Sequence, residues 1–598
     1  MKKIELKVNH IDKNSNSYIE NYLMTLGIAR ENISSFINKP KNEDEDNPFQ
    51  LDNINEAVKI AKEICEQRDA KVFVQVDSDC DGYTSSAILI QYLKRRFPNI
   101  SIQYRLHNGK EHGVIADTIP DDIKLVFIPD AGSNQSEEIQ KIITGGAKVI
   151  ILDHHEVNTE MASSSINNTI VVNNQTSRNF SNKFLSGAGV TYLFCKAMDL
   201  TYYKDVISED YRDLAALGII ADAMNMTSLG NNFISYWGLK NINNKFIKEL
   251  LLKQSRNSKT IGNNNPTKTD ISFYVAPVIN GVIRYGTNED KNMLFKALID
   301  NDSTEVITSE YRSTIREENL YEYAVRLSMN AKSRQDNAKK KSFNWICDKI
   351  KNEHLDNHNI IIVTLDEKES EKVSANITGL IAMELVKEFN KPCLVLRKTE
   401  FDGKIVYGGS GRNGNFYGLL DLKSLLKQSG AFYVEGHASA FGCFLLPEQI
   451  DSIVEYFDKQ LNSSVFEDTV YQVDYWFHTG ETLNRDMLFA FATCGDIWGN
   501  GLPRPTFAFD FNFNSAEVQL MGANKDSVKI KHDGIDFVLF KNQEVAKKLQ
   551  ELNSGHIQIV GAPNLNEWMG RQNIQIIIDD IEIEDIVAAP TRSLADLI

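Results

Sequence analysis

Short apolar runs alternate with amphipathic segments in the first part of the chain. Between about residues 54 and 173, several brief runs rich in Val and Ile have the length and composition of buried strands. The segments "NINEAVKIAKEICEQ", "YTSSAILIQYLKRRF" and "QSEEIQKIITGG" instead carry apolar residues at helical spacing. This alternation predicts a parallel sheet that is covered by helices on both faces. The expected strands are "KVFVQVD", "ISIQYRL", "IKLVFIPD", "AKVIILDHH" and "TIVVNN".

The pattern changes three times further along the chain. Helical spacing dominates from about 186 to 250, and a long, charge-rich helical stretch follows from about 308 to 350. Strands and helices alternate again from about 358 to 447, and β pattern prevails beyond 467, as in a small barrel or sandwich. We therefore expect an α/β protein with a helical lead-in (1–50), a parallel-sheet domain (51–307), a connecting helix (308–357), a smaller α/β domain (358–460) and a β-rich domain (467–598).

Composition adds little to this picture. The chain has 598 residues, a net charge of −16 and no apolar run of the roughly 18 to 20 residues that a membrane helix needs. The basic N-terminus is followed by no export signal, and the seven scattered cysteines form no CxxC pair, so we expect a cytoplasmic protein without a membrane partner. The acidic balance does not exclude a nucleic-acid partner, because the field along one cleft matters more than the total charge.

Three aspartates follow the first strand in "VFVQVDSDCDG": Asp77, Asp79 and Asp81. An EF-hand loop begins in the same way, but it needs a helix before it and a Glu six residues after the Gly, where this chain has Ile88. A solvated acidic turn would require no function. Carboxylates at the end of a buried strand are better placed for metal or phosphate chemistry.

Further candidate ligands follow other strands. "LVFIPDAG" supplies Asp130, "KVIILDHHEV" supplies Asp153, His154 and His155, and Asp222 lies in the apolar stretch "LGIIADAM", where an unpaired carboxylate would be costly. The carboxyl ends of parallel strands share one edge of a sheet, so we expect these groups to converge. Oxygen ligands with imidazole favour Mn²⁺ or Mg²⁺, and the number of ligands fits two ions, the usual arrangement for phosphate-ester hydrolysis.

The motifs "DSDCDG", "PDAG", "LDHH" and "GIIADAM", in this order, resemble the metal-binding motifs of the DHH phosphoesterase superfamily. "APVINGVIRYG" is similar to the arginine motif of RecJ-type single-strand-specific exonucleases, and "GGSGRNGN" and "EGHASAFG" resemble the glycine-rich motifs of their DHH-associated domain. "WGNGLPRPTF" and "NLNEWMGRQNIQIIIDDIE" look like segments of the C-terminal OB domain of that family. The resemblance implies a DHH domain, a smaller DHH-associated domain and an OB-like domain.

The resemblance also implies a role for each matching residue. It assigns two Mn²⁺ or Mg²⁺ ions to Asp77, Asp79, Asp81, Asp130, His154 and Asp222. Asp130 would bridge the ions, Asp77 would be a ligand or a base beside them, His155 would contact the scissile phosphate, and Asp153 would orient the histidines. DNA phosphate would be held by Arg284, Ser410, Arg412 and His437. The alternative for the two arginines is a purely structural role.

A few positions need separate comment. Gly187 and Gly189 in "LSGAGV" either allow close backbone approach or only pack helices, and we favour packing. Three stretches depart from the family pattern: Val373-Ser374 replaces a Trp-His pair, Glu435 replaces the first Gly of a Gly-Gly-His, and Asn413 replaces a Ser. None is a metal ligand, so these differences concern the grip on the substrate.

The resulting hypothesis is a metal-dependent exonuclease that degrades single-stranded DNA, 5′→3′ by resemblance, to 5′-mononucleotides in DNA recombination and repair. We expect a monomer that receives its strand from a single-strand-binding protein or a helicase. Two alternatives are a phosphodiesterase for cyclic dinucleotides or short oligonucleotides, and an inactive DHH protein that serves as a replication scaffold. The alternating aromatics Phe507, Phe509 and Phe511 are expected in the core of the last domain rather than on DNA.

Overall fold

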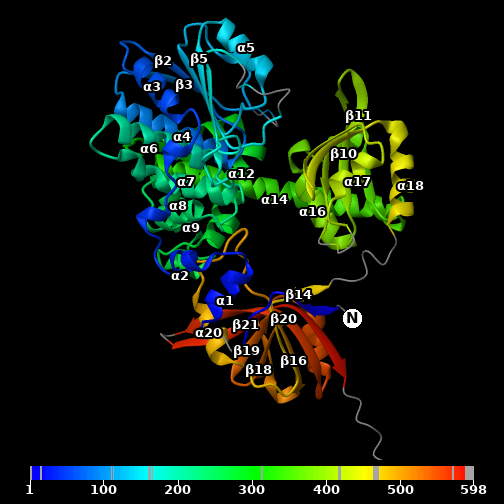
Figure 1. The fold of residues 1–598 in the computed structure, drawn as a ribbon. Helices are drawn as coiled ribbons and strands as arrows, with labels where there is room; N and C mark the ends of the chain where they lie inside the picture. The colour runs from blue at the N-terminus through cyan, green and yellow to red at the C-terminus, as the bar shows by residue number, and fades with distance from the viewer. Residues whose placement is uncertain are drawn as a thin grey trace, which may run out of the picture.

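The chain folds into three lobes (Figure 1). The computed structural model describes residues 3–13, 17–108, 111, 113–158, 163, 166–311, 314–414, 416, 419–461, 470–568 and 571–585. Both ends of the expected β-rich domain, at 467 and 598, lie outside the described residues. No helix in these ranges combines the length and the apolar character that crossing a membrane requires.

A parallel sheet forms the centre of the first lobe, with the strand order β3-β2-β4-β5-β6. The strands are β2 (Lys71–Gln75), β3 (Ser101–Arg105), β4 (Leu125–Pro129), β5 (Lys148–Asp153) and β6 (Thr169–Asn173). One face packs on α5 (Ser136–Thr144), and the other packs on α3 (Ile54–Cys65), α4 (Cys80–Arg96) and α6 (Gly187–Tyr202). The prediction of a parallel sheet with helices on both faces is confirmed.

Helices complete this lobe and lead out of it. They are α7 (Arg212–Ala221), α8 (Leu229–Lys240), α9 (Lys245–Gln254), α12 (Ala276–Tyr285) and α13 (Asn288–Ile299). Helix α14 (Leu320–Asn352) then runs for 33 residues, about 50 Å, to the second lobe (Figure 1). Asn319 caps its start by accepting hydrogen bonds from two backbone N–H groups of the first turn.

The second lobe is a smaller α/β unit with its own core. Its sheet has the order β12-β13-β11-β10-β9 and is antiparallel except for the β9–β10 pair. The strands are β9 (Ile361–Leu365), β10 (Cys393–Phe401), β11 (Lys404–Arg412), β12 (Tyr433–His437) and β13 (Ala440–Leu445), and the helices are α16 (Thr378–Phe389), α17 (Leu422–Gln428) and α18 (Ile450–Gln460).

The third lobe is β-rich, as predicted. Its strands are β15 (Tyr475–Phe477), β16 (Phe507–Asn514), β17 (Val518–Met521), β18 (Ser527–His532), β19 (Ile535–Leu539), β20 (Ser554–Trp568) and β21 (Arg571–Asp585), with helices α20 (Arg485–Thr493) and α21 (Gln543–Glu551). Phe507, Phe509 and Phe511 are buried in its core, which confirms that expectation.

Two segments differ from the expected pattern. Within the lead-in, β1 (Ile4–Leu6) is a strand that pairs in parallel with β14 (Tyr471–Val473). Among the residues of this segment that the structure describes, only α1 (Tyr18–Thr25) and α2 (Ile33–Ile37) are α-helical. A partner so far along the chain leaves no local pattern. The connecting helix also starts later than expected, because the hairpin β7 (Val306–Tyr311) and β8 (Thr314–Asn319) precedes it.

Candidate active site

The turn from β2 into α4 holds three aspartates within five residues. Asp79 is the N-cap of α4 and accepts a hydrogen bond from the Gly82 N–H at 3.0 Å, and Asp81 lies in the first turn of the helix. A Cβ atom at Gly82 would lie 2.7 Å from the Asp77 Cβ atom. The tight turn that brings the three carboxylates together therefore requires glycine at this position.

Asp81 is held by the start of a second helix. It is almost fully buried and accepts hydrogen bonds from the Ser186 Oγ (2.9 Å), the Gly187 N–H (2.7 Å) and the Ala188 N–H (3.1 Å) at the N-terminus of α6. Gly218 of α7 packs directly against the Asp81 carboxylate, where no Cβ atom would fit. These contacts fix the direction of the side chain.

Asp130 follows β4 and lies at the centre of the site. Its backbone has a φ of 65°, a left-handed conformation that is unusual for a residue other than glycine. The residue is 2% exposed, and the Oδ1 atom forms no hydrogen bond within the described part of the chain. A buried carboxylate oxygen without a donor is costly unless a cation compensates it.

The predicted ligands converge around this residue. The His154 Nε2 atom lies 3.2 Å from the Asp130 Oδ1, 3.6 Å from the Asp222 Oδ2 and 3.9 Å from the Asp81 Oδ2. The ligand atoms of Asp130 also lie within 4.8 Å of those of Asp77 and Asp79. Asp130 is thus placed between two groups of ligands, one formed by Asp77 and Asp79 and the other by Asp81, His154 and Asp222.

The electrostatics of this cluster favour a cation. Burial and the neighbouring carboxylates raise the pKa of Asp130 well above its ordinary value. Burial, followed by the charges of Asp81 and Asp79, raises the pKa of Asp222 to about 8. Burial lowers the pKa of His154, which keeps its imidazole neutral and able to coordinate a metal. Carboxylates that repel each other and one neutral imidazole fit Mn²⁺ or Mg²⁺.

His155 lies at the exposed edge of the cluster, with a ring nitrogen within 4.8 Å of ligand atoms of Asp130 and His154, and is oriented by Asp153. The Asp153 Oδ1 atom accepts hydrogen bonds from the His155 Nδ1 (2.7 Å) and from the backbone N–H groups of His154 (2.7 Å) and His155 (3.2 Å). Burial opposes protonation of His155, but its hydrogen bond to Asp153 and nearby carboxylate charges prevail and raise its pKa to about 9. This pKa favours the protonated imidazole at neutral pH.

The predicted phosphate-binding residues gather on the second lobe. Ser410 and Arg412 alternate on β11, and the β11–β13–β12 register places His437 in line with Arg412 on the same face of the sheet. Arg284 reaches this surface from α12, where its carbonyl oxygen accepts a hydrogen bond from the Asn376 Nδ2 at 2.6 Å. Burial and the nearby Arg284 charge lower the pKa of Arg412. Among the described residues, burial and the Arg284 charge, and no carboxylate, act on the Arg412 guanidinium, an arrangement that suits an anion.

Several residues of the site escaped the sequence-based prediction. The Gly113 N–H donates to the Asp77 Oδ1 at 2.6 Å, the buried His107 Nε2 lies 3.8 Å from the same oxygen, and the Asn280 Oδ1 accepts from the Cys80 N–H at 3.1 Å. The motif "YRLHNGKEHG" around His107 offered a signal, because it follows a predicted strand of the same sheet.

The preference for a packing role at Gly187 is wrong. A Cβ atom there would lie 2.5 Å from the Asp130 Cβ, so this glycine lets the start of α6 approach the site. Gly189 does pack within the helix region, against Leu185.

Similarity to known proteins agrees with this geometry. Residues 71–219 match the DHH family, N-terminal domain, and residues 481–580 match the RecJ OB domain. The prophage-derived single-strand DNA-specific exonuclease YorK of Bacillus subtilis (strain 168) is 33% identical over 518 residues, which cover 86% of this chain and 87% of that protein. The single-stranded-DNA-specific exonuclease RecJ of the same organism is 24% identical over 561 residues, which cover 90% of this chain and 64% of that protein.

The fold is also that of a solved structure. RecJ from Thermus thermophilus in complex with Mn²⁺ superposes with a TM-score of 0.69 at 17% identity, covering 97% of this chain and 80% of that one. The whole arrangement of lobes is thus shared, and not the sheet of the first lobe alone.

Proposed function

Because this chain belongs to the DHH phosphoesterase superfamily, in its RecJ-type branch of single-strand-specific exonucleases, we propose that it hydrolyses single-stranded DNA from one end with the help of two divalent metal ions. The polarity we propose is 5′→3′, and the products are 5′-mononucleotides. The cellular role we propose is DNA recombination and repair, with a monomeric enzyme that receives its strand from a single-strand-binding protein or a helicase.

The position of Asp130 carries this proposal. Its carboxylate lies between the Asp77–Asp79 pair and the group formed by Asp81, His154 and Asp222, as a bridging ligand of two ions would. Its Oδ1 atom is buried without a hydrogen-bond donor from the described residues. A pair of divalent ions would supply charge neutralisation at the phosphate and a water molecule of lowered pKa.

The protein's own residues prepare the phosphate for attack. His155, protonated at neutral pH and held by Asp153, offers a positive charge and a hydrogen bond to a non-bridging phosphate oxygen. Arg284 and Arg412 bind a second phosphate of the strand and so fix which bond lies over the metal centre. Asp153 acts through His155 and does not contact the substrate.

The β-rich third lobe favours a long single strand over a small nucleotide. OB folds bind single strands through a charged groove and aromatic side chains, and a dinucleotide would not need one. The complete set of ligand residues argues against an inactive scaffold.

Digestion of labelled strands tests the proposal. Single- and double-stranded DNA labelled separately at each terminus should be incubated with Mn²⁺ and with EDTA. We expect manganese-dependent release of mononucleotides from single strands only, beginning at the 5′ end. Asp130→Ala should abolish it, whereas Asp122→Ala, which removes an exposed carboxylate at the amino end of the same sheet, should not. Equal cleavage of both substrates, or an active Asp130→Ala variant, would refute the proposal, and faster cleavage of cyclic dinucleotides would favour the small-nucleotide alternative.

A further inference from the structure

The sheet face that carries the phosphate-binding residues continues beyond them. On β12, Tyr433 lies four residues before His437, and alternate residues of a strand point to the same face. The register confirms this placement, because Tyr433 pairs with Phe444 and Phe444 with Gly408, while His437 pairs with Ala440 and Ala440 with Arg412. The row of paired residues that contains Tyr433 and the row that contains His437 are about 13 Å apart along the strands, a distance on the scale of a dinucleotide.

Tyr433 and Phe444 of the far row form an aromatic cluster with Phe401, which lies at the end of β10 and contacts both rings. The rings of Phe401 and Phe444 are stacked, with centroids 4.1 Å apart and an interplanar angle of 11°. The Tyr433 ring lies against both, at 5.3 Å from Phe401 and 5.7 Å from Phe444. A Cβ atom at Gly408 would lie 2.5 Å from the Phe444 ring, so the glycine makes room for this ring to lie over β11.

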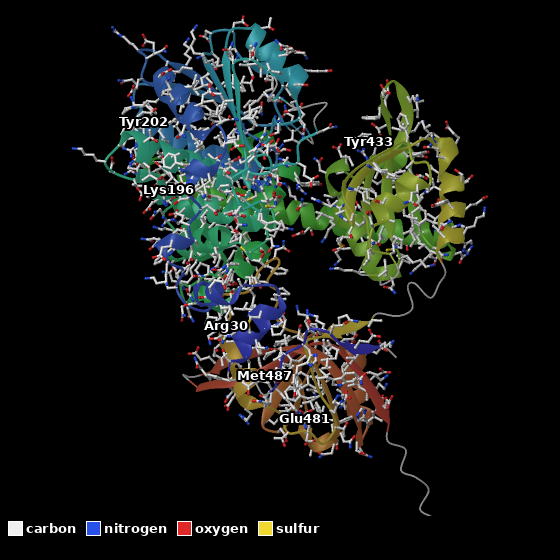
Figure 2. The ribbon with its side chains drawn as sticks, viewed as in Figure 1. Arg30, Lys196, Tyr202, Tyr433, Glu481 and Met487 are labelled. Atoms are coloured by element: carbon white, nitrogen blue, oxygen red, sulfur yellow. The ribbon has the colours of Figure 1, made fainter. Side chains whose placement is uncertain are left out.

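Tyr433 is the exposed member of this cluster, with 37% of its surface accessible. Its ring is fixed from behind by the two phenylalanines, and its hydroxyl donates a hydrogen bond to Glu435. Figure 2 labels Tyr433 on the part of the second lobe that is turned toward the first lobe in that view. A rigid aromatic ring binds at a low entropic cost, because its conformation is already set.

The surroundings of Tyr433 leave space for a flat ligand and disfavour a phosphate. Gly442 on the neighbouring strand has no atom closer than 3.8 Å to the place of a Cβ, so this part of the face is open. Glu435 lies between Tyr433 and His437 on the same face, and its carboxylate would repel a phosphate. A DNA strand whose phosphate is bound at Arg412 can therefore place a base, rather than its backbone, against the sheet beside Tyr433.

We propose that Tyr433 is a stacking surface for a base of the DNA strand whose phosphate is held by Ser410, Arg412 and His437. This inference rests on the proposed function and adds to it a contact that detects a base without distinguishing one kind of base from another. Every base has a π face, so the contact serves an enzyme that must process any sequence. Phe401 and Phe444 act as positioning residues that hold the Tyr433 ring.

Two substitutions at one position test the inference. In EDTA, with a fluorescent single-stranded oligonucleotide, we expect Tyr433→Ala to weaken binding about tenfold and Tyr433→Phe to bind like the parent protein, because stacking needs only the ring. The matched control is Tyr202→Ala, since Tyr202 has the same exposed fraction of 37% but lies on the opposite side of the first lobe (Figure 2). The unfolding temperature of each variant verifies that the fold is retained.

Oligonucleotides with a single abasic sugar, moved one position at a time from the end, locate the contact. One abasic position should weaken binding to the parent protein and have no further effect on Tyr433→Ala, because the same stacking interaction is then already absent. Unchanged affinity of Tyr433→Ala, loss of affinity in Tyr433→Phe, or equal effects of abasic sites on both proteins would overturn the inference. These binding outcomes apply to a parent protein that has been shown to hydrolyse single-stranded DNA with Mn²⁺. If the parent protein does not hydrolyse it, that result counts against the proposed function and not against the stacking contact.

Discussion

Gly187 lies so close to Asp130 that a Cβ atom at position 187 would be 2.5 Å from the Asp130 Cβ atom. The same glycine donates its N–H to the Asp81 carboxylate at 2.7 Å. One residue at the start of α6 thus contacts both the central carboxylate, Asp130, and the neighbouring ligand Asp81, which makes the position of that helix a condition for the metal centre.

We predict that Gly187→Ala lowers the rate of DNA hydrolysis about 100-fold, because the added methyl group must displace Asp130 and a shift of about 1 Å can have an effect of that size. The measurement is the initial rate on single-stranded DNA with saturating Mn²⁺. Gly189→Ala is the matched control, since its methyl group would meet the Leu185 side chain in the core and none of the ligand residues. Equal losses in both variants would show that the helix, and not Asp130, is affected.

The sequence predicts the site best where a candidate ligand residue follows a predicted strand. The sequence places Asp81, Asp130 and His154 together because parallel strands deliver their carboxyl ends to one edge, and in the structure the His154 Nε2 atom lies 3.9 Å from Asp81 and 3.2 Å from Asp130. The role of Gly187 was missed because an approach between two helices and a strand end is a tertiary contact, which leaves no periodic pattern. The β1 strand was missed for the same reason, since its partner β14 lies far along the chain.

Metal removal should make stability depend on pH through Asp222. Burial, then Asp81 and Asp79, raises the pKa of this carboxyl from its ordinary 3.8 to about 8. A raised carboxyl pKa contributes stability that is present at low pH and is lost as the pH rises through the folded-state value. In EDTA we therefore expect the unfolding temperature to fall between about pH 5 and pH 8, and Mn²⁺ should offset the fall by binding the folded state.

Asp222→Asn is expected to flatten this fall in EDTA, because the substituted amide does not ionise. Differential scanning calorimetry at several pH values measures the effect. Asp69→Asn, at a carboxylate whose side chain is 90% exposed, should leave the slope unchanged. A slope that Mn²⁺ does not alter would contradict a metal site at Asp222.

The hydrogen bond between Asp153 and His155 should set the alkaline limit of activity. Burial lowers the pKa of His155, but this hydrogen bond and the nearby carboxylate charges outweigh it and raise the pKa to about 9, which favours the cation at neutral pH. Asp153→Asn keeps an acceptor but removes the charge, and the pKa should fall toward its ordinary value of 6.5. We expect a rate 10- to 100-fold lower at about pH 8 and an activity that declines above about pH 7. A pH–rate profile that keeps its alkaline limit would show that His155 is not needed as a cation.

Arg412 should recognise a phosphate of the strand. Arg412→Ala removes a charge-assisted hydrogen-bond donor, which corresponds to about 1.5–3 kcal/mol, or a 10- to 100-fold higher KM. If the bound phosphate is the 5′-terminal one, the parent protein will prefer 5′-phosphorylated strands over 5′-hydroxyl strands and the variant will lose this preference. Arg95→Ala is the control, because Arg95 is half-exposed and pairs with Asp210 on the surface. A preference retained in Arg412→Ala would place the terminal phosphate elsewhere.

Lys268 connects the first lobe to the third. Its Nζ atom is buried and donates to the carbonyl oxygens of Asp496 (2.9 Å) and Ile497 (3.2 Å) and to the Asn232 Oδ1 (3.2 Å). Lys268→Met would leave these buried acceptors without a donor, and we expect the free energy of unfolding to fall by about 2–3 kcal/mol. Lys259→Met offers a matched control across the same pair of lobes, since Lys259 is 56% exposed where it reaches Glu567 and an exposed ion pair contributes little. Denaturant titration measures both. If the two variants lose stability equally, the burial of Lys268 does not matter and the two lobes are held together by other contacts.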